Sequence, residues 1–113
     1  MDRVADHGET VRAVLERVAG WIRRLPKPDV ETVLAEGTQH DLFLLKRLGW
    51  HDGVRVDNTV ALVRVKAGKV WIEEDWTDLT IADELVKAGV PKEDIVLAFH
   101  PPELRHLTEF AVA

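Results

Sequence analysis

An α+β fold is predicted for this chain: a long N-terminal helix, an antiparallel β-meander of about four strands, a second helix, then a further strand and a short C-terminal helix. Three observations indicate it. Apolar residues recur at helical spacing near the N-terminus, β-branched residues fill the middle of the chain, and a capped helical segment precedes an apolar run near the C-terminus. A length of 113 residues suits one domain, so residues 1–113 are expected to fold as one unit.

The first helix is expected over residues 4–24. Its apolar residues recur at helical spacing, and these are Val4, Val11, Val14, Leu15, Val18 and Ile22. Cations near its C-terminal end favour the helix dipole, and Pro26 and Pro28 terminate it. The basic residues of this segment are Arg12, Arg17, Arg23, Arg24 and Lys27.

Four strands are expected next, over residues 30–36, 40–50, 54–66 and 69–74, separated by turns that each contain a glycine. Residues 40–50 taken alone also fit a helix, but the turns on either side favour a strand. The apolar phase of the third strand changes near residues 57–59, which predicts a bulge or a bend there. Alanine is a poor first residue for a two-residue hairpin turn, so a turn with a glycine bulge is expected at Ala67-Gly68.

The second helix is expected to begin at Thr80, because Thr80 and Asp83 resemble a capping box. It runs to about Ala88, and Gly89 stands where a left-handed C-cap belongs. The acidic run before this helix, residues 73–78, is interpreted as a solvated loop rather than a cation site.

Five consecutive apolar residues, 95–99, predict a strand covered on both faces. It has to end by His100, because the prolines at 101 and 102 cannot continue a ladder. A short helix is expected over 101–107, and Phe110 and Val112 are expected to dock on the core or on a partner.

The composition of the chain excludes several kinds of site and several classes of protein. The chain has no cysteine, which excludes disulfides, thiolate chemistry and Cys-zinc sites. Its longest apolar runs are far shorter than the roughly 18 residues of a membrane span. The N-terminus has no apolar signal-peptide core. A cytoplasmic protein with no membrane contact is therefore expected.

The distribution of charge argues against direct nucleic-acid binding. Residues 1–29 hold six Lys/Arg and five Asp/Glu, whereas residues 30–113 hold nine and fifteen, and the formal net charge is −5. A broad phosphate-binding surface needs clustered cations. A local contact through the first helix is the remaining route to DNA.

The candidate site residues form two polar pairs, His100 with Glu103 and His40 with Asp41. His100 and Glu103 are three apart and could ligate one metal ion if the segment is helical, with His40, Asp41 or His106 adding ligands. That arrangement predicts a metal-assisted hydrolase or nuclease-like enzyme. The competing interpretation is structural: His100 caps the strand end, and Glu103 favours the start of a helix. We favour the structural interpretation and assign no catalytic residue, metal or cofactor.

Four segments together resemble the XisI family, which is named for controlling excision of the fdxN element in cyanobacteria. They are Gly49-Trp50, GKVWIEED at 68–75, IADELVKAGVPKEDIVLAFHPPE at 81–103, and TEFAVA at 108–113. The resemblance covers nearly the whole chain and is strongest over 68–113. The chain departs from the family pattern in three places: Leu42-Phe43 replaces His/Arg-Tyr, Ala67 replaces Asp, and Trp76 replaces Gly.

The resemblance implies a small XisI-like α+β domain that acts as a non-catalytic accessory protein in site-specific DNA excision. It also implies a XisH-type protein as the binding partner. The family offers no established catalytic residues to carry over. A homodimer is left open, because a small open sheet has edges that need covering.

Overall fold

The computed structural model describes residues 3–25 and 29–113, so residues 26–28 of the expected helix end lie outside the described residues, as does the side chain of Val4. The helices are α1 (Arg3–Arg23) and α2 (Ile81–Lys87), with 3-10 helices η1 (Lys92–Asp94) and η2 (Pro102–Leu107). The strands are β1 (Val30–Glu36), β2 (Leu42–His51), β3 (Val54–Lys66), β4 (Lys69–Asp75) and β5 (Ile95–Leu97). The predicted fold class and order of elements are confirmed.

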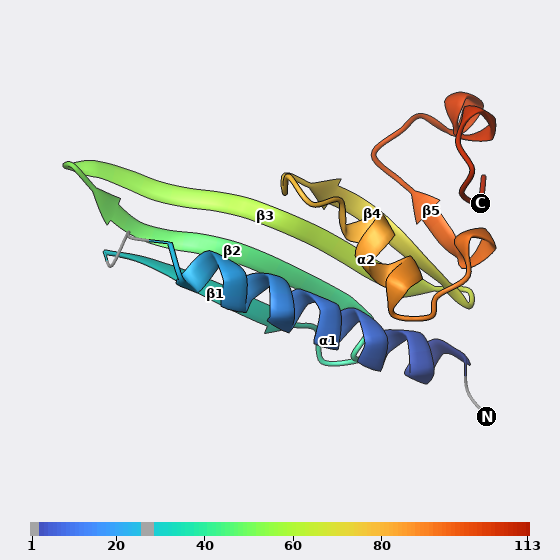
Figure 1. Cartoon of the computed structure of the whole chain (residues 1–113), viewed down its shortest axis with the longest axis horizontal. Coiled ribbons are helices and arrows are strands. Elements are labelled where there is room, and N and C mark those ends of the chain that lie inside the picture. Colours follow the sequence, from blue (N-terminus) through green and yellow to red (C-terminus); the bar gives the residue numbers. More distant parts are fainter. Residues whose placement is uncertain (1–2, 26–28) are drawn as a thin grey trace.

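The five strands form one sheet in the order β1-β2-β3-β4-β5. The first four are antiparallel, as consecutive strands joined by short turns can be. Strand β5 is parallel to β4, because α2 carries the chain back before it re-enters the sheet. Both α-helices lie on the same face of the sheet, which gives a two-layer domain (Figure 1). No helix among the described residues is long and apolar enough to cross a membrane.

The hydrophobic core lies between this sheet face and the two helices. Phe43, Val63 and Ile72 stand opposite one another on adjacent strands and are fully buried. Leu15 and Val18 of α1 pack in the same cluster, as their helical spacing predicts. The opposite sheet face has no helix over it among the described elements (Figure 1).

A bulge interrupts the pairing of β2 with β3. Leu45 pairs with Ala61 and Lys46 pairs with Thr59, so Val60 is the extra residue. The bulge therefore lies one residue beyond the segment 57–59 in which a change of phase was predicted. The Val60 carbonyl accepts a 2.9 Å hydrogen bond from the Trp76 N–H, which attaches the chain leaving β4 to this point of the sheet.

The turn between β3 and β4 differs from the prediction. Lys66 pairs directly with Lys69, and Ala67 and Gly68 have φ values of 54° and 77°. This is a regular two-residue turn with both central residues in the left-handed region, so the expected glycine bulge is wrong. The direct pairing at the strand ends requires the left-handed conformation even though Ala67 carries a Cβ.

Replacing Ala67 with asparagine is expected to stabilise the protein by about 0.5–1 kcal/mol, because asparagine tolerates the left-handed region better than alanine does. Urea unfolding of the two proteins measures the difference. Ala35→Asn, an exposed position in strand β1, is the control and should not stabilise the fold. A destabilised Ala67→Asn variant would contradict the turn geometry.

The start of α2 also differs from the prediction. Thr80 has a left-handed φ of 58° and its side chain makes no capping hydrogen bond, so the predicted capping box is wrong. The Asp75 carboxylate accepts the Ile81 N–H at 2.8 Å instead. The predicted helix end is confirmed: Gly89 has a φ of 105°, and the Val90 N–H donates to the Leu85 carbonyl at 3.0 Å.

The last strand is shorter than predicted. Ile95 and Val96 are fully buried, as a strand covered on both faces requires, but β5 ends at Leu97. The chain then turns, and the His100 N–H donates to the Leu97 carbonyl at 3.1 Å. His100 therefore follows a turn and does not stand at the strand end.

The C-terminal segment returns to the sheet. Ala111 forms a parallel bridge with Val96, and its N–H donates to the Ile95 carbonyl at 2.8 Å. Phe110 packs against the core as expected. Val112 is 52% exposed, so only one of the two apolar residues expected to dock lies against the core.

Candidate functional site

His40 and Asp41 lie in the turn between β1 and β2. The His40 Nδ1 contacts the Glu36 carboxylate, and Arg12 of α1 donates to the same carboxylate from Nε at 2.6 Å and from Nη2 at 2.8 Å. Asp41 takes part in the sheet through its carbonyl, which accepts the Val65 N–H at 2.8 Å. The polar cluster at this turn is thus Arg12, Glu36 and His40, and Glu36 was not among the site residues predicted from the sequence.

This cluster controls the ionisation of Glu36. The hydrogen bonds from Arg12, and secondly from His40, lower the pKa of Glu36 from its usual 4.5 to about 2. The same carboxylate raises the pKa of Arg12. The arrangement joins the middle of α1 to the end of β1 and leaves His40 largely exposed.

Glu36→Gln is expected to weaken the acid sensitivity of folding. Because folding lowers the Glu36 pKa, its stabilising effect is present above about pH 4.5 and is lost as the pH falls toward about 2. The wild type should therefore melt at a higher temperature than the variant at about pH 6, and the two should converge toward about pH 2. Thermal unfolding followed by circular dichroism across this range measures the effect. Glu31→Gln, which removes an exposed carboxylate from the same strand, is the control.

His100, Glu103 and His106 lie in the C-terminal segment. The His100 ring contacts the Phe99 ring at a tilt of 51°, with centroids 4.6 Å apart, and the His100 carbonyl accepts a hydrogen bond from Arg105 Nε at 3.0 Å. Arg105 also donates to the Val112 and Ala98 carbonyls at 3.3 and 3.4 Å. Its guanidinium therefore organises this segment through backbone contacts.

The two predicted polar pairs are not brought together. Leu42, Arg64, Trp71 and Val96 form one row across β2 to β5, so the turn carrying His40 and Asp41 is three strand spacings, about 14 Å, from β5. His100 follows β5, the edge strand on the opposite side of the sheet from β1. Among the residues that the structure describes, no group of three or more His, Asp or Glu side chains is arranged to hold a metal ion.

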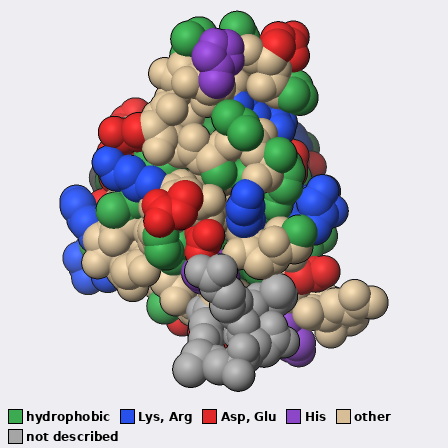
Figure 2. All heavy atoms as spheres, turned by 90° about the vertical axis from the view of Figure 1, so that its right-hand side faces the viewer, with side chains coloured by type: hydrophobic (Ala, Val, Ile, Leu, Met, Phe, Trp, Pro, Cys, Tyr) green, Lys and Arg blue, Asp and Glu red, His purple; other side chains and the backbone are tan. Residues whose placement is uncertain are grey.

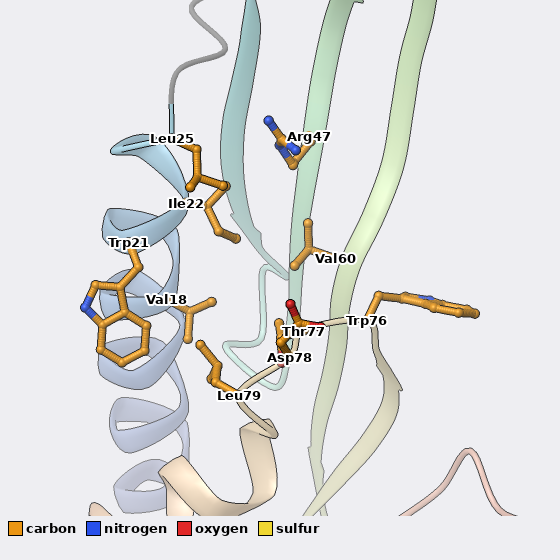
Figure 3. A pocket seen from close by; sticks show the side chains of 10 residues that line it. All are labelled: Val18, Trp21, Ile22, Leu25, Arg47, Val60, Trp76, Thr77, Asp78 and Leu79. Atoms are coloured by element: carbon orange, nitrogen blue, oxygen red, sulfur yellow. The ribbon is translucent and has the colours of Figure 1, made fainter.

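A groove lies elsewhere on the molecule, between α1, the bulged part of the sheet and the loop that joins β4 to α2 (Figure 3). Its volume is about 400 Å³. Ten residues line it: Val18, Trp21, Ile22, Leu25, Arg47, Val60, Trp76, Thr77, Asp78 and Leu79. No sequence pattern indicates this groove, because four segments that are distant in sequence form it.

The loop beneath the groove is held by Asp75. One carboxylate oxygen accepts the N–H and the hydroxyl of Thr77, at 2.9 and 2.6 Å, and the other accepts the Ile81 N–H. An acidic run interpreted as a solvated loop thus contains a carboxylate that positions three lining residues, 77–79. This internal bonding gives the groove a defined wall.

Arg47 is the cation of the groove. It lies two residues beyond Leu45 on β2 and therefore points to the helix-covered face. Its Nε is buried without a hydrogen-bond partner among the described residues, and no salt bridge is found for its guanidinium there. Asp78, on the loop, is the acidic residue of the lining, and Figure 3 shows it at the other end of the groove from Arg47. In the sequence, Arg47 is recognisable as a basic residue that continues the two-residue spacing of the buried apolar residues Phe43 and Leu45.

Comparisons with known proteins agree with the resemblance seen in the sequence. The XisI protein family matches residues 1–112. A XisI-like protein from Anabaena variabilis is 33% identical with a TM-score of 0.88, and the match covers 97% of this chain and 99% of that one. The fdxN element excision controlling factor XisI from the same organism is 37% identical with a TM-score of 0.83, and the match covers 99% and 100%. No curated protein matches the chain. The agreement in sequence, length and fold shows that this chain belongs to the XisI family.

Proposed function

We propose that this protein is a non-catalytic accessory factor in DNA-element excision that acts by binding a XisH-type protein. The observation that carries the proposal is the end-to-end similarity to the XisI excision controlling factor, whose whole chain is matched. A shared fold and shared length favour a shared mode of action, although function rests on surfaces rather than on the fold.

The exposed surface supports a role in protein binding. Three of the four tryptophans are more than one third exposed, namely Trp21, Trp50 and Trp76. Tryptophan is among the residues most enriched at the energetically important centres of protein interfaces. Large exposed aromatic side chains on a 113-residue domain therefore favour a partner protein.

The basic residues of α1 support a protein partner over direct DNA contact. Arg12 is paired with Glu36, and Arg23 donates to the Thr32 carbonyl at 2.9 Å. Figure 2 shows the other end of the molecule, where α1 begins; there, Lys and Arg side chains are interspersed with Asp and Glu and do not merge into one basic area. With a net charge of −5, we assign contact with DNA to the partner.

Co-expression of the untagged chain with a tagged XisH-type protein tests this proposal. We expect the two to copurify and to form a complex of defined stoichiometry, measured by size exclusion with light scattering. The same experiment on the chain alone gives its own oligomeric state. Absence of association at micromolar concentrations of both proteins would refute the proposal.

A further inference from the structure

We propose that the groove between α1, the bulge of β3 and the β4–α2 loop receives a segment of a partner polypeptide that presents a carboxylate beside an apolar side chain. Arg47 is the residue that binds the carboxylate. This inference rests on the proposed function and deepens it, because it names the docking surface and the chemistry that the surface recognises.

The unpaired guanidinium of Arg47 is the first reason. A buried N–H without an acceptor is unfavourable. A carboxylate is a strong acceptor for a guanidinium, because it can take two parallel hydrogen bonds. The protein itself shows this geometry at Arg12, whose Nε and Nη2 hold both oxygens of Glu36. Arg47 has no carboxylate within the described residues, and its two Nη groups are the donors left for a carboxylate in the groove, because its Nε is enclosed.

The local charge is the second reason. Thr32 stands opposite Arg47 in the sheet, and the Thr32 carbonyl accepts a hydrogen bond from Arg23. Two guanidinium groups thus approach this end of the groove, and neither has a salt bridge to a carboxylate in the described part of the chain. Asp78 lies at the other end (Figure 3), so it leaves the charge at Arg47 uncompensated.

The apolar walls and rim favour a polypeptide over a small molecule. Val18, Ile22, Val60 and Leu79 form an apolar wall that suits an aliphatic or aromatic side chain. Beside this wall, Trp21 and Leu25 are 37% and 55% exposed, whereas Trp76, which is 74% exposed, has its indole turned away from the wall (Figure 3). These side chains extend the apolar surface beyond the groove, and arginine and tryptophan are the residue types that anchor protein interfaces.

The first test uses two short probes and nuclear magnetic resonance of the full chain. Acetyl-Leu-Glu-amide is expected to shift the Arg47 Nε–H and the Trp21 indole resonances saturably, with a dissociation constant of about 1–10 mM. The neutral acetyl-Leu-Gln-amide should bind at least about tenfold more weakly. Equal binding of both peptides, or no saturable shift with the acidic one, would overturn the proposal.

Variants separate Arg47 from other effects. Arg47→Gln is expected to abolish the preference for the acidic peptide without lowering the melting temperature, because the guanidinium makes no internal hydrogen bond through its buried Nε. Arg64→Gln is the matched control: this exposed arginine on β3 lies 3.9 Å from Glu73, outside the groove, and its variant should bind like the wild type. An unchanged peptide preference in Arg47→Gln contradicts the assignment.

Two further outcomes would show that the groove is occupied by something other than a partner polypeptide. If hexanoate alone binds as tightly as the acidic peptide, the groove is a site for small apolar carboxylates and the polypeptide assignment is overturned. If the chain self-associates in light scattering and Arg47→Gln abolishes this, the occupant is a second copy of the chain, which also overturns it.

The complex with the XisH-type protein distinguishes this inference from the proposed function. We expect Arg47→Gln to weaken that complex by about 30-fold or more, with Arg64→Gln unchanged. A complex that forms equally well with Arg47→Gln overturns the groove while the proposed function stands. If the wild type forms no complex, the proposed function fails, and the peptide titration alone decides whether the groove binds a carboxylate.

Discussion

Gly49→Ala is expected to destabilise the protein by more than about 3 kcal/mol, because a side chain at this position collides with backbone that cannot move aside. A Cβ on Gly49 would stand 2.1 Å from the Asp29 carbonyl oxygen and 2.9 Å from the Val30 Cα. The φ of Gly49 is +154°, which is unfavourable for other residues. The neighbouring Trp50 N–H donates to the same Asp29 carbonyl, so this close approach fixes where β1 begins against β2.

Urea unfolding of the purified variants measures this effect, with Gly20→Ala as the control. Gly20 lies within α1, and a Cβ there meets nothing within 4 Å. Gly20→Ala is therefore expected to stabilise the protein, by up to about 1 kcal/mol. The two substitutions add the same methyl group with opposite expected signs. A Gly49→Ala protein as stable as the wild type would contradict the close approach of Asp29.

Phe43→Ala is expected to cost about 3–5 kcal/mol, the range found when a buried phenylalanine is truncated and the space is incompletely refilled. Phe43 is fully buried and stands opposite Glu36 on one side and Val63 on the other. The Arg12 guanidinium lies 6.0 Å from the centre of its ring, so the ring also supports the side chain that holds Glu36. The loss of unfolding free energy should therefore exceed the loss expected from the buried area of the ring alone.

The unfolding free energy of Phe43→Ala is best compared with that of Leu107→Ala. Leu107 is 73% exposed on η2, so its truncation should change stability by less than about 0.5 kcal/mol. A second comparison uses Glu36→Gln in both backgrounds. If Phe43 supports Arg12, the effects of Phe43→Ala and Glu36→Gln will be non-additive. Equal costs for Phe43→Ala and Leu107→Ala would contradict the central position of the ring.

Elements with strong local signals were predicted to the residue or nearly so. Strands 30–36 and 54–66 have the predicted bounds, because β-branched residues and flanking turn residues act within the segment. The end of α2 at Gly89 is likewise a local matter, since the left-handed C-cap depends on one residue. The similarity to the XisI family, concentrated in residues 68–113, was also visible in the chain itself.

Errors arose where a distant group outcompetes a local one. The Asp75 carboxylate replaces Thr80 as the cap of α2, because the chain between them folds back on itself. Strand β5 stops at Leu97 rather than Phe99, because the chain turns away after the Ala98 N–H has bonded to the Ile72 carbonyl, although β4 itself continues to Asp75. The helix and strand propensities of the residues involved predict neither the cap by Asp75 nor the early end of β5.

The local sequence therefore determines the number, order and type of the helices and strands, and it indicates the family to which the chain belongs. Long-range packing determines which side chains meet at the surface. It paired Glu36 with Arg12, separated His100 from His40, and gathered Arg47, Val60 and Leu79 around one groove. The physical reason is that periodicity records which side of an element is buried, whereas a site depends on which elements meet, and only the register, the bulge at Val60 and the parallel return of β5 decide that.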